Sequence, residues 1–257
     1  MALLEVADLN KRFGGLSAVQ ELHFDIRAGE LLSIIGPNGA GKTTLFNLLT
    51  GFYKPTSGTV IFNGADITGY KPYQITRCGI SRTFQMTSIY KQADVLDNVI
   101  VGQALHAKVR VWGTVLRTPA ANRKEQKARN KAREILSFVG LAKDEKKIAG
   151  SLTEEAQKRL SIAMALATEP KLLLLDEPTG GVNLDEIGGL IELVEKIRKS
   201  HITICLIEHK MKMVMSISDR IVVLNYGKNI ADGTPKEVAN NEEVIRAYLG
   251  ARYVAQG

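Results

Sequence analysis

The sequence predicts an α/β fold whose core is a largely parallel β-sheet. Short apolar runs rich in Ile, Val and Leu recur along the 257 residues, at 31–35, 59–62, 172–175, 202–207 and 221–224. Stretches with helical periodicity lie between them, at 42–49, 128–139, 157–167 and 184–199. Strands that alternate with helices favour parallel pairing, because each helix carries the chain back to the edge where the next strand begins.

Residues 86–167 follow a different, mainly helical pattern, with a loop near 112–119 that contains Gly113 and Pro119. We therefore expect a single domain in which a helical lobe interrupts an α/β core formed by residues 1–85 and 168–250. Residues 251–257 are expected to be a frayed tail. The densest basic stretch, residues 123–133, has apolar residues at helical spacing, which favours a solvated helix face over an RNA or lipid patch.

Composition and charge indicate the compartment and the kinds of partner that suit the protein. The net charge of +7 is a mild excess, compatible with nucleic acid, a membrane surface or anionic nucleotides. The apolar runs are far shorter than the ~20 residues of a membrane helix, and the first residues do not resemble a secretory signal. Cys78 and Cys205 lack disulfide or metal spacing, and Cys205 is expected to be a buried small hydrophobe. These features fit a cytosolic chain that reaches a membrane only through a partner.

A phosphate-binding loop follows the apolar run 31–35. The pattern G-x-x-x-x-G-K-[ST] is matched at every fixed position by Gly36-Pro37-Asn38-Gly39-Ala40-Gly41-Lys42-Thr43, with Thr44 next in the chain. Glycines let successive backbone N–H groups point at phosphate oxygens, and the following helix adds the partial positive charge of its N-terminus. Lys42 is expected to reach the β- and γ-phosphates, and Thr43 to hold Mg²⁺.

A second motif is a leucine run that ends in two acids, Asp176 and Glu177. Open α/β sheets bind ligands at the carboxyl ends of their strands, so these carboxylates are expected beside the phosphate loop. Asp176 would contact the Mg²⁺ shell. Glu177 points to the other side and can polarise the attacking water.

These motifs resemble those of the ATP-binding cassette (ABC) proteins over almost the whole chain. Arg82-Thr83-Phe84-Gln85 resembles the Q-loop of that family, and Ile207-Glu208-His209 resembles its switch-histidine segment. The resemblance implies a P-loop NTPase core with a largely parallel sheet, an N-terminal antiparallel β portion and an inserted helical lobe.

The resemblance also implies the ligands and the roles of individual residues. ATP and Mg²⁺ are the implied cofactors. Gln85 would join Thr43 and Asp176 at the metal, and His209 would lie near the γ-phosphate, so that Lys42, Gln85, Glu177 and His209 form the implied catalytic set. Phe13 matches the aromatic residue that stacks on adenine.

A narrower resemblance points to the ATPase subunits of branched-chain amino acid importers. It is carried by Lys11-Arg12-Phe13-Gly14-Gly15, the insertion at residues 99–133, Ile207-Glu208-His209-Lys210-Met211, and residues 244–250. It implies a cytoplasmic subunit on the inner face of the cell membrane. Its partners would be a second ABC ATPase subunit, permease subunits and, for an importer, a solute-binding protein, with no nucleic acid.

The signature loop departs from the family pattern Leu-Ser-Gly-Gly-Gln, which clasps the γ-phosphate of ATP on the opposite subunit. The matching stretch is Leu152-Thr153-Glu154-Glu155-Ala156. Thr153 can still cap the helix. Glu154 and Glu155 replace the two glycines, and one carboxylate at about 4 Å from a phosphate would cost about 4 kcal/mol at an effective dielectric near 20.

This departure favours a heterodimer with unequal sites, in which a partner supplies the intact signature loop to this chain's ATP. Other readings remain: a transporter ATPase for another cargo, such as urea, an amide or a lipid, or a regulatory ABC protein that cycles poorly. A soluble ABC protein of DNA repair or translation is disfavoured, because such proteins usually carry two cassettes or a long coiled-coil or zinc insertion and this sequence has neither. A P-loop kinase or GTPase would leave Gln85 and His209 without a role.

Overall fold

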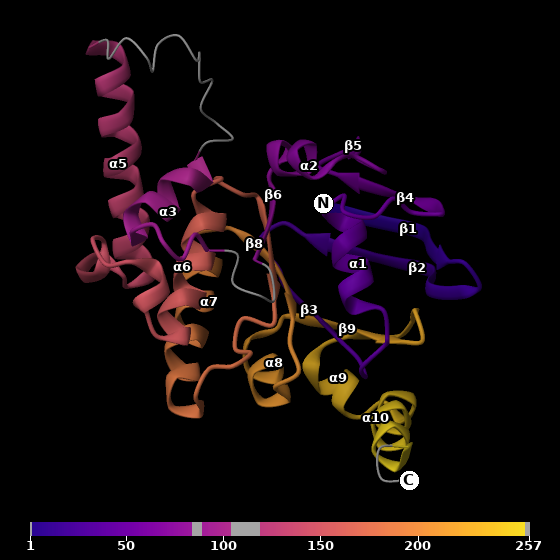
Figure 1. Cartoon of the computed structure of the whole chain (residues 1–257). Coiled ribbons are helices and arrows are strands. Elements are labelled where there is room, and N and C mark those ends of the chain that lie inside the picture. Colours follow the sequence, from indigo (N-terminus) through magenta and orange to yellow (C-terminus); the bar gives the residue numbers. More distant parts are fainter. Residues whose placement is uncertain (1, 84–88, 104–118, 255–257) are drawn as a thin grey trace.

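The computed structural model describes residues 2–83, 89–103 and 119–254, which form two sheets and the helices around them (Figure 1). The first sheet is antiparallel, with the strand order β2-β1-β4-β5. Its strands are β1 (Ala2–Phe13), β2 (Leu16–Arg27), β4 (Ser57–Phe62) and β5 (Ala65–Asp66). The expected N-terminal antiparallel portion is therefore confirmed.

The second sheet has six strands in the order β10-β9-β3-β8-β7-β6. In chain order they are β3 (Leu31–Ile35), β6 (Ile80–Thr83), β7 (Leu172–Asp176), β8 (Thr203–Ile207), β9 (Arg220–Asn225) and β10 (Lys228–Gly233). Every pair is parallel except the edge pair β9–β10. The largely parallel core is confirmed, and β3 has the predicted bounds.

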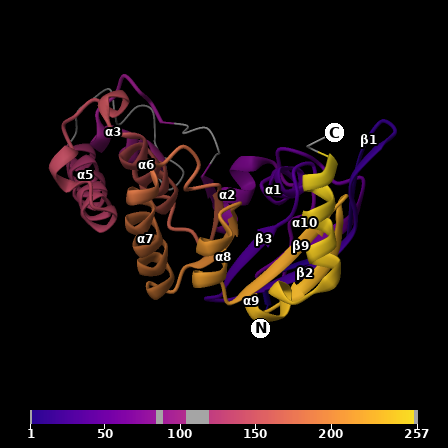
Figure 2. The ribbon, with the colours of Figure 1, turned by 90° about the horizontal axis from the view of Figure 1, so that it is seen from below.

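Helices cover both faces of the parallel sheet, as Figures 1 and 2 show. Helix α1 (Lys42–Leu49) packs between the two sheets, and its Leu45, Phe46 and Leu49 join one buried cluster with both. The opposite face carries α6 (Glu154–Leu166), α7 (Ile187–Lys199) and α8 (Met211–Ile217). Within the described parts of the chain, no helix has the length and apolar character of a membrane span.

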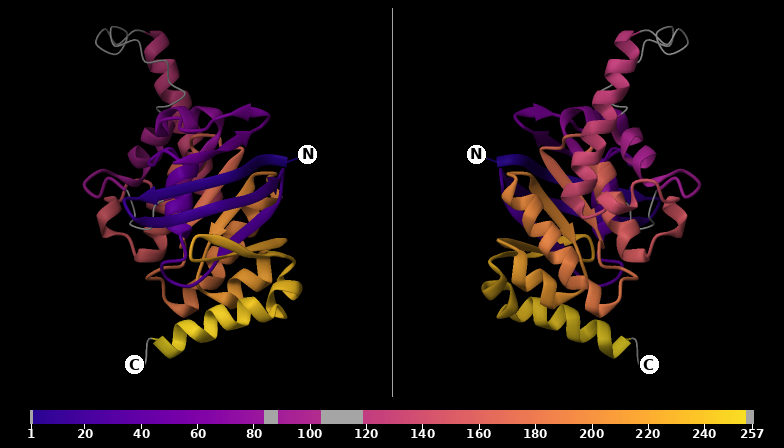
Figure 3. Two further views of the ribbon diagram at one scale, coloured as in Figure 1. Left: turned by 90° about the vertical axis from the view of Figure 1, so that its right-hand side faces the viewer. Right: turned by 90° about the vertical axis from the view of Figure 1, so that its left-hand side faces the viewer.

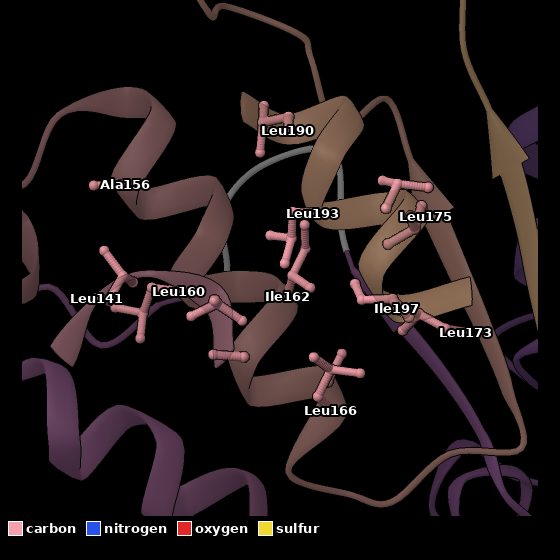
Figure 4. Close-up of a cluster of buried hydrophobic side chains, with 14 of the residues drawn as sticks. Leu141, Ala156, Leu160, Ile162, Leu166, Leu173, Leu175, Leu190, Leu193 and Ile197 are labelled. Atoms are coloured by element: carbon pink, nitrogen blue, oxygen red, sulfur yellow. The ribbon is translucent and has the colours of Figure 1, made fainter. Parts of the chain in front are cut away.

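Strand β7 explains why the predicted leucine run is continuous. Leu172 and Leu174 face the cluster around α1, whereas Leu173 and Leu175 face the cluster around α6 and α7 (Figure 4). All four leucines are fully buried. A parallel strand with both faces covered needs apolar side chains in succession, and each such leucine stabilises the fold by about 2 kcal/mol.

The inserted helices are α3 (Val95–Gly102), α5 (Pro119–Val139) and α6, which pack on one another. Helix α5 begins earlier than the predicted residue 128, since proline suits the first turn of a helix. Helix α6 begins at Glu154 rather than 157 because Thr153 caps it. The α7 segment opens with the 3₁₀ turn Leu184–Glu186. Of the loop expected near 112–119, residues 112–118 lie outside the described residues, and Pro119 is the first residue of α5.

Further helices complete the fold. They are α2 (Pro72–Cys78), α9 (Pro235–Ala239) and α10 (Glu242–Val254), besides the 3₁₀ turns Ala142–Asp144 and Ala149–Ser151. Residues 251–254 continue α10, which lies along one side of the molecule (Figure 3), and the fraying expected from residue 251 stays a prediction. This helix is held because Val244 and Tyr248 pack into a cluster with Ile35 and Val223.

A largely buried arginine, whose side chain is 12% exposed, joins the two sheets. Arg220 on β9 donates through Nη2 to the backbone oxygen of Asp25 on β2 at 2.7 Å and through Nη1 to Glu30 Oε1 at 3.3 Å. Its Nε lies 2.8 Å from Asp232 Oδ1 on β10. Burial lowers the pKa of Arg220, but the carboxylates of Glu30, Asp232 and Asp25 outweigh that effect and leave its pKa raised.

Arg220→Met should lower the free energy of unfolding by about 3 kcal/mol, because it leaves the carboxylate of Glu30, which is 8% exposed, without its cation. Urea unfolding followed by circular dichroism measures this change. Arg246→Met is the matched control, since Arg246 pairs with Glu242 at an exposed position, and we expect a change below about 0.5 kcal/mol there. Equal stability of the two variants would contradict this account of the sheet junction.

Candidate functional site

The carboxyl ends of three parallel strands bring the predicted site residues to one edge of the sheet. Strand β3 pairs with β8 so that Ile34 lies opposite Ile207, and β7 pairs with β8 so that Asp176 lies opposite the same residue. The chain leaves β3 into the phosphate loop, leaves β7 at Glu177 and leaves β8 toward His209. The predicted convergence of these motifs is therefore present.

The phosphate loop turns where side chains have no room. A Cβ on Gly36 would lie 2.1 Å from the backbone oxygen of Leu224, and one on Gly41 would lie 2.5 Å from that of Ala18. Gly41 caps α1 with a φ of +102°, which an L-residue with a side chain rarely adopts. Backbone contact with β9 and β2 thus explains two of the glycines. The other loop positions, Pro37, Asn38, Gly39 and Ala40, lie between them.

Lys42 is folded back onto the loop. Its Nζ donates to the backbone oxygens of Gly36 at 2.7 Å and Pro37 at 2.9 Å, and its side chain is buried. Burial lowers the pKa of Lys42, while the carboxylates of Glu177 and Asp176 raise it in part. Because its present partners are neutral carbonyl oxygens, the Lys42 ammonium group can exchange them for phosphate oxygens while α1 stays in place. Thr43 and Thr44, at the start of the same helix, are exposed and half-buried.

Asp176 is paired with an arginine for which the sequence analysis had no role. Arg82 on β6 donates through Nη2 to Asp176 Oδ2 at 2.6 Å and through Nη1 to Asn47 Oδ1 on α1 at 2.7 Å. The side chains of Arg82 and Asp176 are 5% and 1% exposed. A buried carboxylate needs such compensation, and the guanidinium also fixes its orientation.

The other oxygen of Asp176 is available to a metal ion. Among the described residues, Asp176 Oδ1 has no hydrogen-bond partner although it is buried. Such an atom is costly to leave unsatisfied, and carboxylate oxygen is a ligand that Mg²⁺ takes. The residues present therefore fit a divalent cation between Asp176 and the start of α1, where Thr43 could offer its hydroxyl.

Glu177 and His209 meet across the strand ends. His209 Nε2 lies 2.8 Å from Glu177 Oε1, and both side chains are partly exposed. The Glu177 backbone has a φ of +47°, an unusual value for this residue type, and its N–H donates to the Ile207 oxygen at 2.9 Å. Strain of this kind persists where the surroundings hold the residue, and it often marks functional sites.

Two further residues were predicted to belong to the site, and the structure describes only Phe13 of the two. Phe13, at the end of β1, is 42% exposed and packs edge-on against Tyr53, with ring centroids 5.2 Å apart. Lys11 Nζ lies 4.9 Å from the Phe13 centroid. Because the ring is exposed, it is available for stacking on a base. Gln85 lies outside the described residues.

The signature-loop stretch forms the first turn of α6. Thr153 caps it, as predicted, by accepting a hydrogen bond from the Ala156 N–H at 3.2 Å. Glu155 is held by Arg159, one turn further along, and Arg159 Nη1 also donates to the Val139 oxygen at 3.0 Å. Of the two acids that replace glycines, Glu155 is thus neutralised within its own chain.

The other acid, Glu154, lies against the segment that follows Glu177. A Cβ on Gly181 would come within 2.7 Å of Glu154 Oε2. Lys158 on the same helix donates to the Glu177 backbone oxygen at 3.5 Å. Burial lowers the pKa of Lys158, and the carboxylates of Glu177, Glu208 and Glu154 raise it in part. The helix therefore brings both an acid and a cation to the end of β7.

The sequence analysis missed Arg82, Lys158 and Glu208. Arg82 and Glu208 were quoted only as parts of motifs. Their partners lie 94 and 29 residues away in the chain, so no local pattern indicates the contacts. Lys158 stands four residues after Glu154, a spacing that places the two on one helix face and could have indicated their proximity.

Comparison with known proteins supports the motif resemblance. The profile of the family described as "ABC transporter" matches residues 19–180. A second, described as "Branched-chain amino acid ATP-binding cassette transporter", matches residues 228–254. The crystal structure of a nucleotide-free ATP-binding cassette from an ABC transporter superposes with a TM-score of 0.85 at 31% sequence identity, and the match covers 96% of this chain and 99% of that one.

Two characterised relatives match over nearly their whole length. The high-affinity branched-chain amino acid transport ATP-binding protein LivG of Salmonella typhimurium is 46% identical over 249 residues, which cover 96% of this chain and 98% of LivG. The protein of the same description named BraF, from Pseudomonas aeruginosa, is 44% identical over the same shares. The family match and these identities, together with the phosphate loop and the converging strand ends, mean that the chain belongs to the ABC transporter family.

Proposed function

We propose that this chain is the ATP-hydrolysing subunit of a membrane importer for branched-chain amino acids. The main support for the proposal is the position of four side chains at one edge of the parallel sheet: Lys42, Asp176, Glu177 and His209. The cargo is supported by the descriptions of LivG and BraF, because these relatives align with the chain from end to end. A transporter of another small amide or lipid would need a different permease but the same site.

The proposed mechanism assigns one task to each side chain. The loop from Gly36 to Thr44 surrounds the phosphates of ATP with backbone N–H groups, and Lys42 exchanges its two carbonyl partners for phosphate oxygens. Phe13 stacks on the adenine ring. Glu177 accepts a proton from the attacking water, and His209, within hydrogen-bond distance of it, orients that carboxylate or the γ-phosphate.

Mg²⁺ would be held by Asp176 Oδ1 and the Thr43 hydroxyl, with Gln85 as the third candidate. When bound, the ion neutralises charge that develops on the phosphates. Arg82 keeps Oδ2 of Asp176 engaged, so that the second oxygen faces the nucleotide.

The partner in this proposal is a second cassette subunit. Glu154 and Glu155 stand where glycines would let another chain's ATP approach the start of α6. Because Arg159 neutralises Glu155, the obstacle is mainly the bulk of both side chains and the charge of Glu154. We infer a heterodimer in which the ATP bound by this chain is clasped by the partner's intact loop and hydrolysed. The partner's own ATP, which faces Glu154, turns over slowly.

The remaining partners and the location follow from the same proposal. Permease subunits would anchor the chain to the inner face of the cell membrane from the cytoplasm, and a solute-binding protein would deliver the cargo. The division into an α/β core, residues 1–85 and 168–250, and a helical lobe, residues 86–167, fits this role, because relative motion of the two parts could pass from the ATP site to the permease.

Glu177→Gln should retain ATP binding and lower hydrolysis by at least about 100-fold, because the amide cannot accept the proton of the water. Binding is measured with a fluorescent ATP analogue, and hydrolysis by phosphate release from the assembled transporter. Glu134→Gln, on the exposed face of α5, is the matched control and should hydrolyse ATP at the wild-type rate. Normal hydrolysis by Glu177→Gln would show that another group activates the water.

Replacing both Glu154 and Glu155 by glycine should raise the ATPase rate of this chain alone by about tenfold, which corresponds to about 1.4 kcal/mol of restored transition-state stabilisation. The physical reason is that the glycines remove both the bulk and the charge from the face offered to a second copy. The rate is measured at protein concentrations that span dimer formation.

The control for this pair is the replacement of Glu242 and Glu243, the two exposed acids in the first turn of α10, by glycine. This variant should leave the rate unchanged. Robust hydrolysis by the unmodified chain alone, with no change on glycine substitution at 154 and 155, would contradict the proposed dependence on a partner.

A further inference from the structure

Glu208 is a deeply buried acid between the end of β8 and His209. It is 2% exposed, and the mechanism proposed above gives it no task. A carboxylate in such a place is costly unless several donors surround it, and its removal from water must be offset by specific contacts. Its contacts therefore indicate what it does for the structure.

Four donors surround the Glu208 carboxylate. Oε1 accepts the Thr179 N–H at 3.0 Å and also the Thr179 hydroxyl. Oε2 accepts the backbone N–H groups of His209 at 2.8 Å and Lys210 at 3.2 Å. One oxygen thus holds the segment that follows Glu177, and the other holds the segment that contains His209. The carboxylate, which only accepts hydrogen bonds, matches this set of four donors.

Further bonds lock the same two segments together. Lys210 Nζ donates to the Thr179 oxygen at 3.0 Å, and the Glu177 N–H donates to the Ile207 oxygen at 2.9 Å. Thr179 has no exposed surface. The positive φ of Glu177 lies within this locked region, where neighbouring bonds can maintain an unfavourable backbone conformation.

We propose that Glu208 is a positioning residue for ATP hydrolysis, whose carboxylate holds the Glu177 segment against the His209 segment. The proposal rests on the roles assigned to Glu177 and His209 above. Glu208 itself touches neither ATP nor water in this account. It acts by keeping His209 Nε2 and Glu177 Oε1 at their 2.8 Å separation.

Glu208→Gln is the most informative substitution because it preserves volume but changes one acceptor into a donor. Whichever way the amide turns, its NH₂ group faces at least one backbone N–H that cannot rotate away. We expect kcat to fall by about 10- to 100-fold, since small displacements of catalytic groups have effects of this size. The KM for ATP should change less than about twofold, because the hydrogen bonds of Glu208 to the described residues go to Thr179, His209 and Lys210 and not to the phosphate loop.

Two further variants separate this role from a general loss of structure. Thr179→Val removes the hydroxyl donor and should lower kcat, whereas Thr179→Ser keeps both donors and should restore it. Glu192→Gln, at an exposed position of α7, is the matched control for the loss of an acid and should leave kcat unchanged. Thermal unfolding and binding of a fluorescent ATP analogue are measured for every variant, so that the Thr179 pair decides if Glu208→Gln does not fold.

The decisive comparison is made in a background that lacks His209. In the assembled transporter with His209→Ala, the further change Glu208→Gln should lower kcat by less than about threefold, because the contact between His209 and Glu177 that Glu208 maintains is already absent. Wild-type kcat in Glu208→Gln or Thr179→Val, or an undiminished effect in the His209→Ala background, would overturn the proposal. Hydrolysis that survives Glu177→Gln would instead contradict the proposed function, so the two failures are distinguishable.

Discussion

The parallel register of β3, β8 and β7 is the constraint on which the proposed ATP site depends. Ile207 lies opposite both Ile34 and Asp176, so three strands end at one level and release their loops on the same side. The register thereby brings the phosphate loop, the two acids and the His209 segment to the same edge of the sheet. That register is maintained because each strand buries both of its faces, and a shift of β7 along its neighbours would carry Asp176 into the core.

This convergence gathers buried charged groups at one edge of the sheet, and each is compensated by specific contacts. Arg82 engages one oxygen of Asp176, four donors surround Glu208, and the P-loop carbonyls hold Lys42. Two features differ from this pattern. Asp176 Oδ1 has no hydrogen-bond partner among the described residues, and the pair of Glu177 and His209 is partly exposed. In the proposed mechanism, reactivity is thus confined to the groups assigned to the nucleotide, whereas the groups behind them orient and neutralise.

Sequence reasoning was accurate where local physics requires particular residues. The phosphate loop needs glycines because Leu224 and Ala18 approach its backbone, and β3 and β7 read as continuous apolar runs because both faces are covered. It missed contacts such as Arg82 with Asp176, which join residues 94 positions apart. It also treated Glu154 and Glu155 alike, although Arg159, four residues after Glu155, neutralises only that acid. Gln85 remains a prediction.

The central claim is that this chain supplies one half of a composite ATP site. Its most direct test is the molar mass in solution, by light scattering, of the Glu177→Gln variant with ATP and Mg²⁺, alone and mixed with the second cassette subunit of its transporter. We expect a one-to-one heterodimer in the mixture and a monomer when the variant is alone. A stable ATP-dependent homodimer of this chain, formed as readily as the mixed dimer, would contradict it.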